Sequence, residues 1–291
     1  MASELNHPYE VLDVFTDTPM QGNPLAVFTE GEAVPSRLML ATARELHLSE
    51  TVFLLPGDED CDAQLRIFTP RAELPFAGHP TLGAAFVVGE RDDLATVRLR
   101  TIAGIVPIRL RREHGEIVYG EMDQPMPKVS KLPNPDPLLA VLGVYDAALP
   151  VEVYVNGPEH VLVALHSGAA VAALDPDMTG LSRLVNQLMI HNLTISCFAK
   201  VGDGEFKTRV FCPGVGVLED PATGSAAGPL ALHTARHGWS EFGRTIQLTQ
   251  GAEIHRPSRL TARVDGTIEH PERIVVGGSA VRVAQGFFRL Q

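Results

Sequence analysis

The sequence contains one pattern twice, as RIFTPRAELPFAGHPTLGAA in residues 66–85 and as RVFCPGVGVLEDPATGSAA in residues 209–227. Each copy begins with Arg-x-Phe-x-Pro, which is typical of a strand that ends in a turn, and finishes in a run of small residues that predicts a helix start. The two copies lie about half a chain length apart. Each half of this 291-residue chain is long enough to bury its own core. We therefore expect one domain that has been duplicated.

The two predicted helix starts, residues 78–85 and 220–227, have the composition of anion-binding sites. A helix N-terminus leaves backbone N–H groups without helical partners, and its dipole attracts negative charge. Small side chains at Gly78, Gly224 and Ser225 permit a close approach to a ligand. Two such helix starts that face one cleft would hold a small carboxylic acid. Asp220 before a proline also fits an ordinary N-cap, and His79 before Pro80 fits a residue that merely precedes a helix.

Short predicted strands outnumber helices in both halves, which indicates an α+β fold with antiparallel or mixed sheets. Hairpins are predicted for residues 9–28 and 151–165, and helices for residues 35–47 and 181–190. Proline-rich residues 123–137 are predicted to be a linker, which places a domain boundary near Lys128.

Composition excludes several classes of protein. A net charge of −11 disfavours nucleic-acid binding, which requires clustered lysine and arginine. No apolar run approaches the roughly 18 residues that a membrane-spanning helix needs. The first residues lack the pattern of a secretory signal, so we expect a cytoplasmic protein.

Cofactor and metal motifs are incomplete. No glycine-rich segment has the spacing of a nucleotide-binding loop, so no nucleotide cofactor is expected. His233 and His237 have the spacing of a zinc site on a helix, but a surface or packing role is the more common use of such a pair, and no metal is expected. Cys61, Cys197 and Cys212 are widely spaced and are predicted to be reduced, mostly buried thiols.

Several strings along the chain together resemble the PhzF family of phenazine-biosynthesis isomerases. These strings follow one another in the order and spacing of that family, nearly from end to end: Gly22-Asn23-Pro24, Leu48-Ser49-Glu50-Thr51, Arg66–Pro70, Glu73–Pro80, Met122–Pro125, Asn156-Gly157-Pro158, Glu219–Leu230 and Gln250-Gly251. The two small-residue segments are the most specific part of this resemblance.

The resemblance implies the diaminopimelate epimerase-like fold, an α+β fold of two similar domains. In this fold each domain is a barrel-like mixed sheet curled around a central helix, and the active site lies between the domains. The expected domains are residues 1–128, completed by the last strand at about 280–291, and residues 129–279. The resemblance also implies a homodimer.

The implied activity is a cofactor-independent isomerisation of trans-2,3-dihydro-3-hydroxyanthranilate. By resemblance, Glu50 is the base that moves a proton from C3 to C1, and His79 and Asp220 assist it. Gly78, Gly224, Ser225 and Thr223 are the expected substrate-binding residues, with Asn23 in a supporting role. Relatives in the racemase branch use two cysteines at the helix starts. The chain has no cysteine at those places, which favours the one-carboxylate mechanism.

Two alternatives remain open at this point. The chain could be a PhzF-like isomerase or epimerase of another small amino or hydroxy acid, because the anion-holding framework does not identify the ring. It could also be a noncatalytic module that binds a small acid. The complete set of glutamate, histidine, aspartate and serine argues against the latter, since a binding module needs no proton shuttle.

Overall fold

The computed structural model of the protein describes residues 6–187, 193–213 and 217–290. The chain divides into two compact units. The first contains the described residues up to Asp123 together with those from Gly277 onward, and the second is Gln124–Val276. The last strand of the chain therefore belongs to the same unit as the first. No helix in the described part of the chain is long and apolar enough to cross a membrane.

A curved mixed sheet forms most of the first unit. Its strands are β1 (Asn6–Val14), β2 (Asn23–Phe28), β3 (Glu50–Pro56), β4 (Ala63–Phe68), β5 (Glu73–Leu74), β6 (Thr96–Thr101), β7 (Gly104–Glu113), β8 (Glu116–Gln124) and β18 (Ala280–Arg289). The order across the sheet is β18, β1, β2, β3, β4, β6, β7, β8. The pairs β2/β3 and β4/β6 are parallel and the others antiparallel, while β5 pairs with β4. The hairpin expected at the start of the chain is confirmed as β1/β2.

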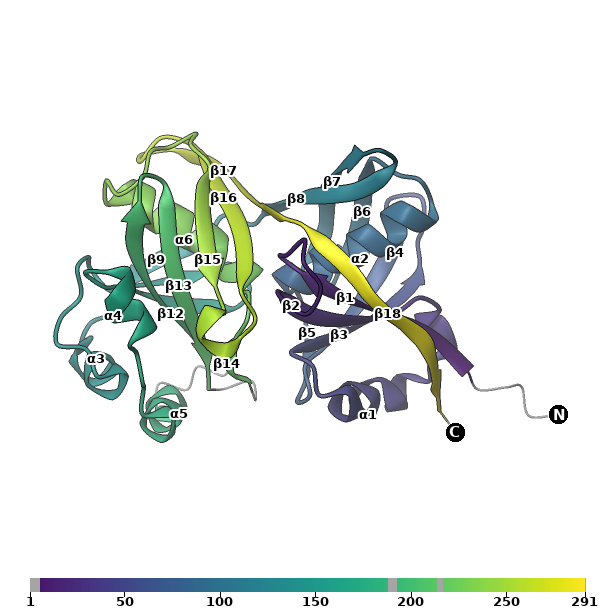
Figure 1. Ribbon diagram of the computed structural model, residues 1–291, viewed down its shortest axis with the longest axis horizontal. Coiled ribbons are helices and arrows are strands. Elements are labelled where there is room, and N and C mark those ends of the chain that lie inside the picture. The colour runs from purple at the N-terminus through teal and green to yellow at the C-terminus, as the bar shows by residue number, and fades with distance from the viewer. Residues whose placement is uncertain (1–5, 188–192, 214–216, 291) are drawn as a thin grey trace. The chain divides into compact units, whose positions relative to one another are not determined.

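Helix α2 (Gly78–Arg91) is the central element of this unit (Figure 1). It contacts six of the strands, namely β1, β2, β3, β4, β6 and β7. Residues 78–89 of the helix are all buried, which explains why it is apolar or small on every side. At Gly83 a Cβ atom would lie 2.5 Å from Leu25 Cδ2, so the glycine allows the helix to approach the sheet closely. A second helix, α1 (Ser36–Leu46), follows the short 3₁₀ turn Gly31–Ala33 and buries Met39 and Ala43.

The second unit repeats this architecture. Its strands are β9 (Lys128–Lys131), β10 (Glu152–Val155), β11 (Glu159–Ala164), β12 (Leu193–Gly202), β13 (Glu205–Cys212), β14 (Val217–Asp220), β15 (Ile246–Gln250), β16 (Ser258–Gly266) and β17 (Pro271–Gly278). The order is β9, β10, β11, β12, β13, β15, β16, with β14 paired to β13. As in the first unit, two pairs are parallel, β11/β12 and β13/β15. The expectation of two similar domains, each with a mixed sheet around a central helix, is confirmed.

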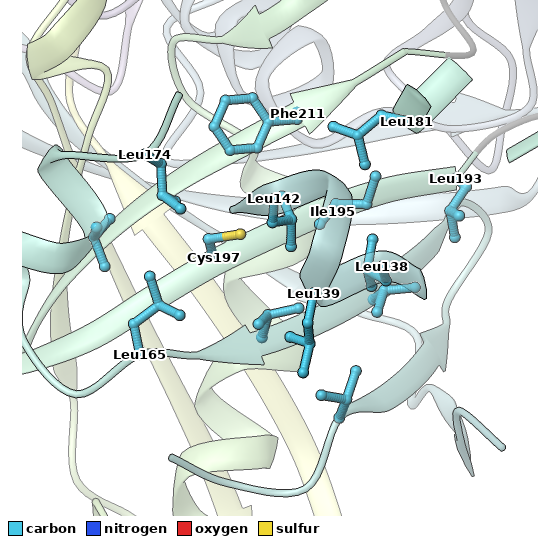
Figure 2. Packing of buried hydrophobic residues seen from close by; sticks show 14 of the residues in the cluster. Leu138, Leu139, Leu142, Leu165, Leu174, Leu181, Leu193, Ile195, Cys197 and Phe211 are labelled. Atoms are coloured by element: carbon cyan, nitrogen blue, oxygen red, sulfur yellow. The ribbon is translucent and has the colours of Figure 1, made fainter. Parts of the chain in front are cut away.

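Helix α6 (Gly224–Arg236) occupies the place that α2 has in the first unit, and its residues 224–235 are all buried. The other face of the sheet is covered by α3 (Asp136–Leu142), α4 (Gly168–Ala172) and α5 (Met178–Gln187). Figure 2 shows Leu138, Leu139 and Leu142 of α3 packed against Ile195 and Cys197 of β12. A 3₁₀ turn, Ala252–Ile254, precedes β16. The sheet of the second unit is thus packed on both faces, with α3, α4 and α5 on one face and α6 on the other.

Three local expectations differ from the structure. Residues 123–137, expected to be a linker, contain the end of β8 and all of β9. Strand β9 is exposed and is formed by its backbone pairing with β10, which leaves no apolar pattern in the sequence. Asp220 is not an N-cap: it ends β14, and α6 starts later, at Gly224. His79 lies inside the first turn of α2 rather than before it. The predicted helix 181–190 is confirmed as α5 up to Gln187, and residues 188–190 lie outside the described part.

Candidate active site

Glu50 and His79 come together in the first unit. Glu50 is the first residue of β3, and His79 is the second residue of α2. The Oε2 atom of Glu50 lies 3.4 Å from Nε2 of His79, and the two side chains are 16% and 4% exposed. Burial lowers the pKa of His79 from 6.5 to about 3, so the imidazole is neutral near neutral pH. A carboxylate therefore faces a neutral histidine.

Asn23 fixes the tautomer of this histidine. It is the first residue of β2 and follows Gly22, whose φ of +67° requires the left-handed region that glycine tolerates. Asn23 Nδ2 lies 3.2 Å from His79 Nδ1, and both groups are buried. Because the amide nitrogen can only donate, His79 Nδ1 accepts, and the single proton of the neutral ring is on Nε2. The N–H group on that side of the ring is the one nearest to Glu50. Asn23 thus contacts His79 directly, in line with the supporting role expected for it.

The start of α2 provides backbone donors beside this pair. Among the described residues, no side chain caps the helix at Ala77, and the N–H groups of Gly78 and His79 lie in the first turn, where no helical carbonyl can accept from them. Pro80 occupies the next position and has no N–H group. A buried helix start of this kind favours a bound anion.

A second group of expected site residues lies at the start of α6. Thr223 donates its hydroxyl proton to Asp220 Oδ2 at 2.6 Å, and both residues are 8% exposed. Gln250 holds both ends of this turn: its Oε1 accepts from Thr223 N at 3.1 Å and its Nε2 donates to Asp220 O at 2.7 Å. These bonds hold residues 220–223 in a turn outside the helix, which begins only at Gly224. Gly224 and Ser225 then supply the N–H groups of the first turn, and Ser225 is 7% exposed.

Three polar residues of this unit were not among the expected site residues. Gln250 acts as described, Asn156 Nδ2 donates to Ser225 O at 3.0 Å, and Gln124 Nε2 donates to Gly224 O at 2.8 Å. All three are buried. The sequence offered one signal for them, since each lies in a string that contributed to the family resemblance. Their partners are too distant along the chain to be inferred from spacing.

The expected site residues therefore form two half-sites, each at the start of a central helix. The first half-site contains Asn23, Glu50, Gly78 and His79, and the second contains Asp220, Thr223, Gly224 and Ser225. Each half-site combines an acidic side chain with backbone donors. Such a combination can bind a carboxylate and move a proton.

Strand register identifies the position in the second unit that corresponds to Glu50. The two repeated arginines pair across their strands with Phe53 and Cys197. Glu50 lies three residues before Phe53, and Thr194 lies three residues before Cys197, so the two positions are equivalent. The second unit thus has a hydroxyl where the first has a carboxylate, and this hydroxyl is hydrogen-bonded to His160 Nδ1. The candidate base is present in one unit and replaced in the other.

The cysteines have no place in either half-site. All three are reduced thiols and buried, which confirms that expectation. Cys197 faces the core formed with α3, and burial raises its pKa to about 12, so it stays a thiol. This environment is unsuitable for a thiolate base, which a two-cysteine racemase requires.

Glu152, His233 and His237 form a cluster in the second unit in which the first two are buried and His237 is half-buried, and their potential ligand atoms lie within 4.8 Å of one another. A metal is nevertheless disfavoured there, because Arg236 Nη1 lies 2.8 Å from Glu152 Oε2 and provides the positive charge that a cation would supply. Tyr154 donates its hydroxyl proton to the same oxygen at 2.9 Å. Burial alone would raise the pKa of Glu152, but hydrogen bonds from His237 and Tyr154 and the charge of Arg236 outweigh burial and lower it. His233 is fully buried in this polar network, not at the surface.

Comparison with known proteins identifies related chains. The family model "Phenazine biosynthesis-like protein" (PhzC-PhzF) matches residues 12–286. A curated trans-2,3-dihydro-3-hydroxyanthranilate isomerase from Pseudomonas fluorescens is 44% identical over 96% of this chain and 98% of its own length. The counterpart from Pseudomonas aeruginosa is 45% identical over the same shares.

Solved structures agree with this relationship. A PhzF-family phenazine biosynthesis protein from Bacillus anthracis superposes with a TM-score of 0.85 at 25% identity, covering 98% of this chain and 99% of its own. A hydroxyproline epimerase from Agrobacterium vitis shares the fold, with a TM-score of 0.71 at 14% identity, covering 100% of this chain and 94% of its own.

Proposed function

Since this chain belongs to the PhzC-PhzF family of phenazine biosynthesis-like proteins, we propose that it is a trans-2,3-dihydro-3-hydroxyanthranilate isomerase in which Glu50 is the proton-transferring base. The observation that carries the proposal is the pair formed by half-buried Glu50 and buried, neutral His79 at the start of α2, with 3.4 Å between Oε2 and Nε2. One carboxylate accounts for the reaction, because the same group accepts a proton and returns it.

In the proposed reaction, the Glu50 carboxylate takes the proton from C3 of the substrate. The electron pair of the broken C–H bond enters the ring π-system, and C1 accepts the proton from the Glu50 carboxyl group. The enol at C3 then tautomerises to the ketone. No proton is gained or lost overall, and no redox change occurs. His79 keeps its Nε2–H group beside Glu50 throughout, since Asn23 holds the opposite ring nitrogen.

The second half-site is proposed to hold the substrate. Its backbone donors at Gly224 and Ser225, like those at Gly78, suit the substrate carboxylate. Asp220 suits the amino or hydroxyl group of the ring, and Thr223 keeps the Asp220 carboxyl group in place through its 2.6 Å hydrogen bond. Orientation is the main contribution of these groups. We propose that both half-sites act on one substrate molecule and that the two compact units are the two domains of the family fold.

The one-base proposal fits the position equivalent to Glu50 in the second unit, which does not hold a second base of the same kind. Thr194 stands at the position equivalent to Glu50, and a threonine hydroxyl is not a base near neutral pH. The proposal also includes a homodimer, which the family resemblance implies, and a location in the cytoplasm.

The test is turnover of trans-2,3-dihydro-3-hydroxyanthranilate in deuterated buffer, followed by ultraviolet absorbance and product mass. Glu50→Gln keeps the shape of the side chain but removes the base, so turnover should fall by about 10²–10⁴-fold. Binding of 3-hydroxyanthranilate, an aromatic analogue, should change little. Glu116→Gln makes the same chemical change at an exposed position and is the matched control.

Three outcomes separate the candidate functions. Loss of turnover in Glu50→Gln alone supports the proposal. Tight binding of the analogue without turnover by the unmodified protein would favour a noncatalytic module. Turnover of a different amino or hydroxy acid, also lost in Glu50→Gln, would keep the mechanism and replace the substrate.

A further inference from the structure

Arg209 on β13 and Glu219 on β14 form a bidentate ion pair. Nε donates to one carboxylate oxygen at 2.9 Å and Nη2 donates to the other at 2.7 Å, and each side chain is only 9% exposed. The remaining arm, Nη1, donates to the backbone O of Leu174 at 2.6 Å, just beyond α4. The guanidinium also lies over the ring of Phe211, 5.1 Å from its centroid. One side chain thus links β14, β13 and the segment after α4.

The first unit has the same arrangement. Arg66 on β4 donates to both oxygens of Glu73 on β5, at 2.7 and 2.8 Å, and lies over Phe68 at 5.1 Å. In each unit the pair joins a sheet strand to the short strand that leads to the central helix. Because the ion pair occurs at the equivalent place in both units, we infer that it has the same structural role in each, next to the start of the central helix. The pair in the first unit is more exposed, at 26% and 28%.

The position of Glu219 next to Asp220 connects this ion pair with the candidate active site. Successive side chains of a strand point to opposite faces, so a group that holds Glu219 from one face also sets the direction of Asp220 on the other. β14 has only four residues, and its register with β13 shifts next to this pair. Few backbone bonds therefore fix its rotation.

We propose that Arg209 is a positioning residue for Asp220 and acts through Glu219. As far as catalysis is concerned, this inference rests on the proposed function, in which Asp220 acts on the substrate. Two parallel hydrogen bonds define both the distance and the rotation of the Glu219 carboxylate. A lysine at position 209 would keep the charge but offers a single point of contact, so β14 could rotate and move the Asp220 carboxyl group.

A double-mutant cycle tests the proposal through activity. Arg209→Lys should lower kcat/KM by about tenfold or more, chiefly through kcat, in the otherwise unmodified protein. In the Asp220→Asn background the same substitution should lower kcat/KM less than about twofold, because the group that it positions is already lost. An equal loss in both backgrounds would mean that Arg209 acts on stability or on other residues, and would overturn the proposal.

A second measurement does not depend on turnover. The ¹³C resonance of the Asp220 carboxyl group, assigned with Asp220→Asn, should shift in Arg209→Lys and stay unchanged in Arg66→Lys, the matched variant of the other unit. An unchanged resonance in Arg209→Lys would overturn the proposal even if the enzyme is active. If the unmodified protein does not turn over the dihydrohydroxyanthranilate, the proposed function fails, and the resonance alone decides the role of Arg209.

Discussion

Replacing His160 with asparagine should make the protein less sensitive to acid. His160 is fully buried in β11, its Nδ1 is hydrogen-bonded to Thr194, and burial lowers its pKa from 6.5 to about 3. The unfolded chain therefore binds a proton on this residue below pH 6.5, while the folded protein does not until about pH 3. Stability is lost as the pH falls through this window. Asparagine keeps an amide group near the position of Nδ1 and does not titrate.

The magnitude follows from proton linkage. For an unfolded pKa of 6.5, protonation at pH 5 stabilises the unfolded chain by RT ln(1 + 10^1.5), about 2 kcal/mol, compared with about 0.2 kcal/mol at pH 7. Protonation of the folded form is negligible at both pH values. A folded pKa one unit higher would change this difference by less than about 0.1 kcal/mol. His160 should thus remove about 2 kcal/mol of stability between pH 7 and pH 5.

Urea unfolding at pH 7 and pH 5, followed by circular dichroism, measures this contribution. The free energy of unfolding of the unmodified protein should fall by about 2 kcal/mol more between the two pH values than that of His160→Asn. His114→Asn removes an exposed histidine from a turn and controls for the change in composition. An equal fall in the unmodified protein and in His160→Asn would refute the reasoning, because His160 would then not be held neutral by burial.

Two further predictions concern buried groups. Iodoacetamide at pH 8 should leave the folded protein unmodified and its turnover unchanged, because all three cysteines are buried and burial raises the pKa of Cys197 to about 12. Rapid alkylation with loss of activity would contradict a mechanism without thiols. Glu152→Gln should lower the free energy of unfolding by about 1.5–3 kcal/mol, since it removes the charge that accepts hydrogen bonds from half-buried Arg236 and buried Tyr154. A loss below about 1 kcal/mol in urea unfolding would show that the network contributes little.

The duplicated architecture could be predicted from the sequence because it depends on local patterns. The repeat that begins at Arg66 and Arg209, the small residues at both helix starts and the strand-rich halves follow from composition and periodicity over short windows. Boundaries were less predictable where a tertiary contact decides them. The hydrogen bonds from Gln250 hold residues 220–223 in a turn outside the helix, so the helix begins at Gly224 although the local sequence fits an earlier N-cap.

The sequence by itself determined the family resemblance, the duplication of a domain and the residue types available for proton transfer. Only the tertiary structure decided which of them meet: Glu50 with His79, Asn23 with the other nitrogen of that imidazole, and Arg209 with the neighbour of Asp220. The physical reason is that helix and strand patterns arise from neighbouring residues, whereas these contacts depend on strand register and on the packing of a central helix inside a sheet. Residues far apart in the chain come together only once the strand register and the packing of the central helix are fixed.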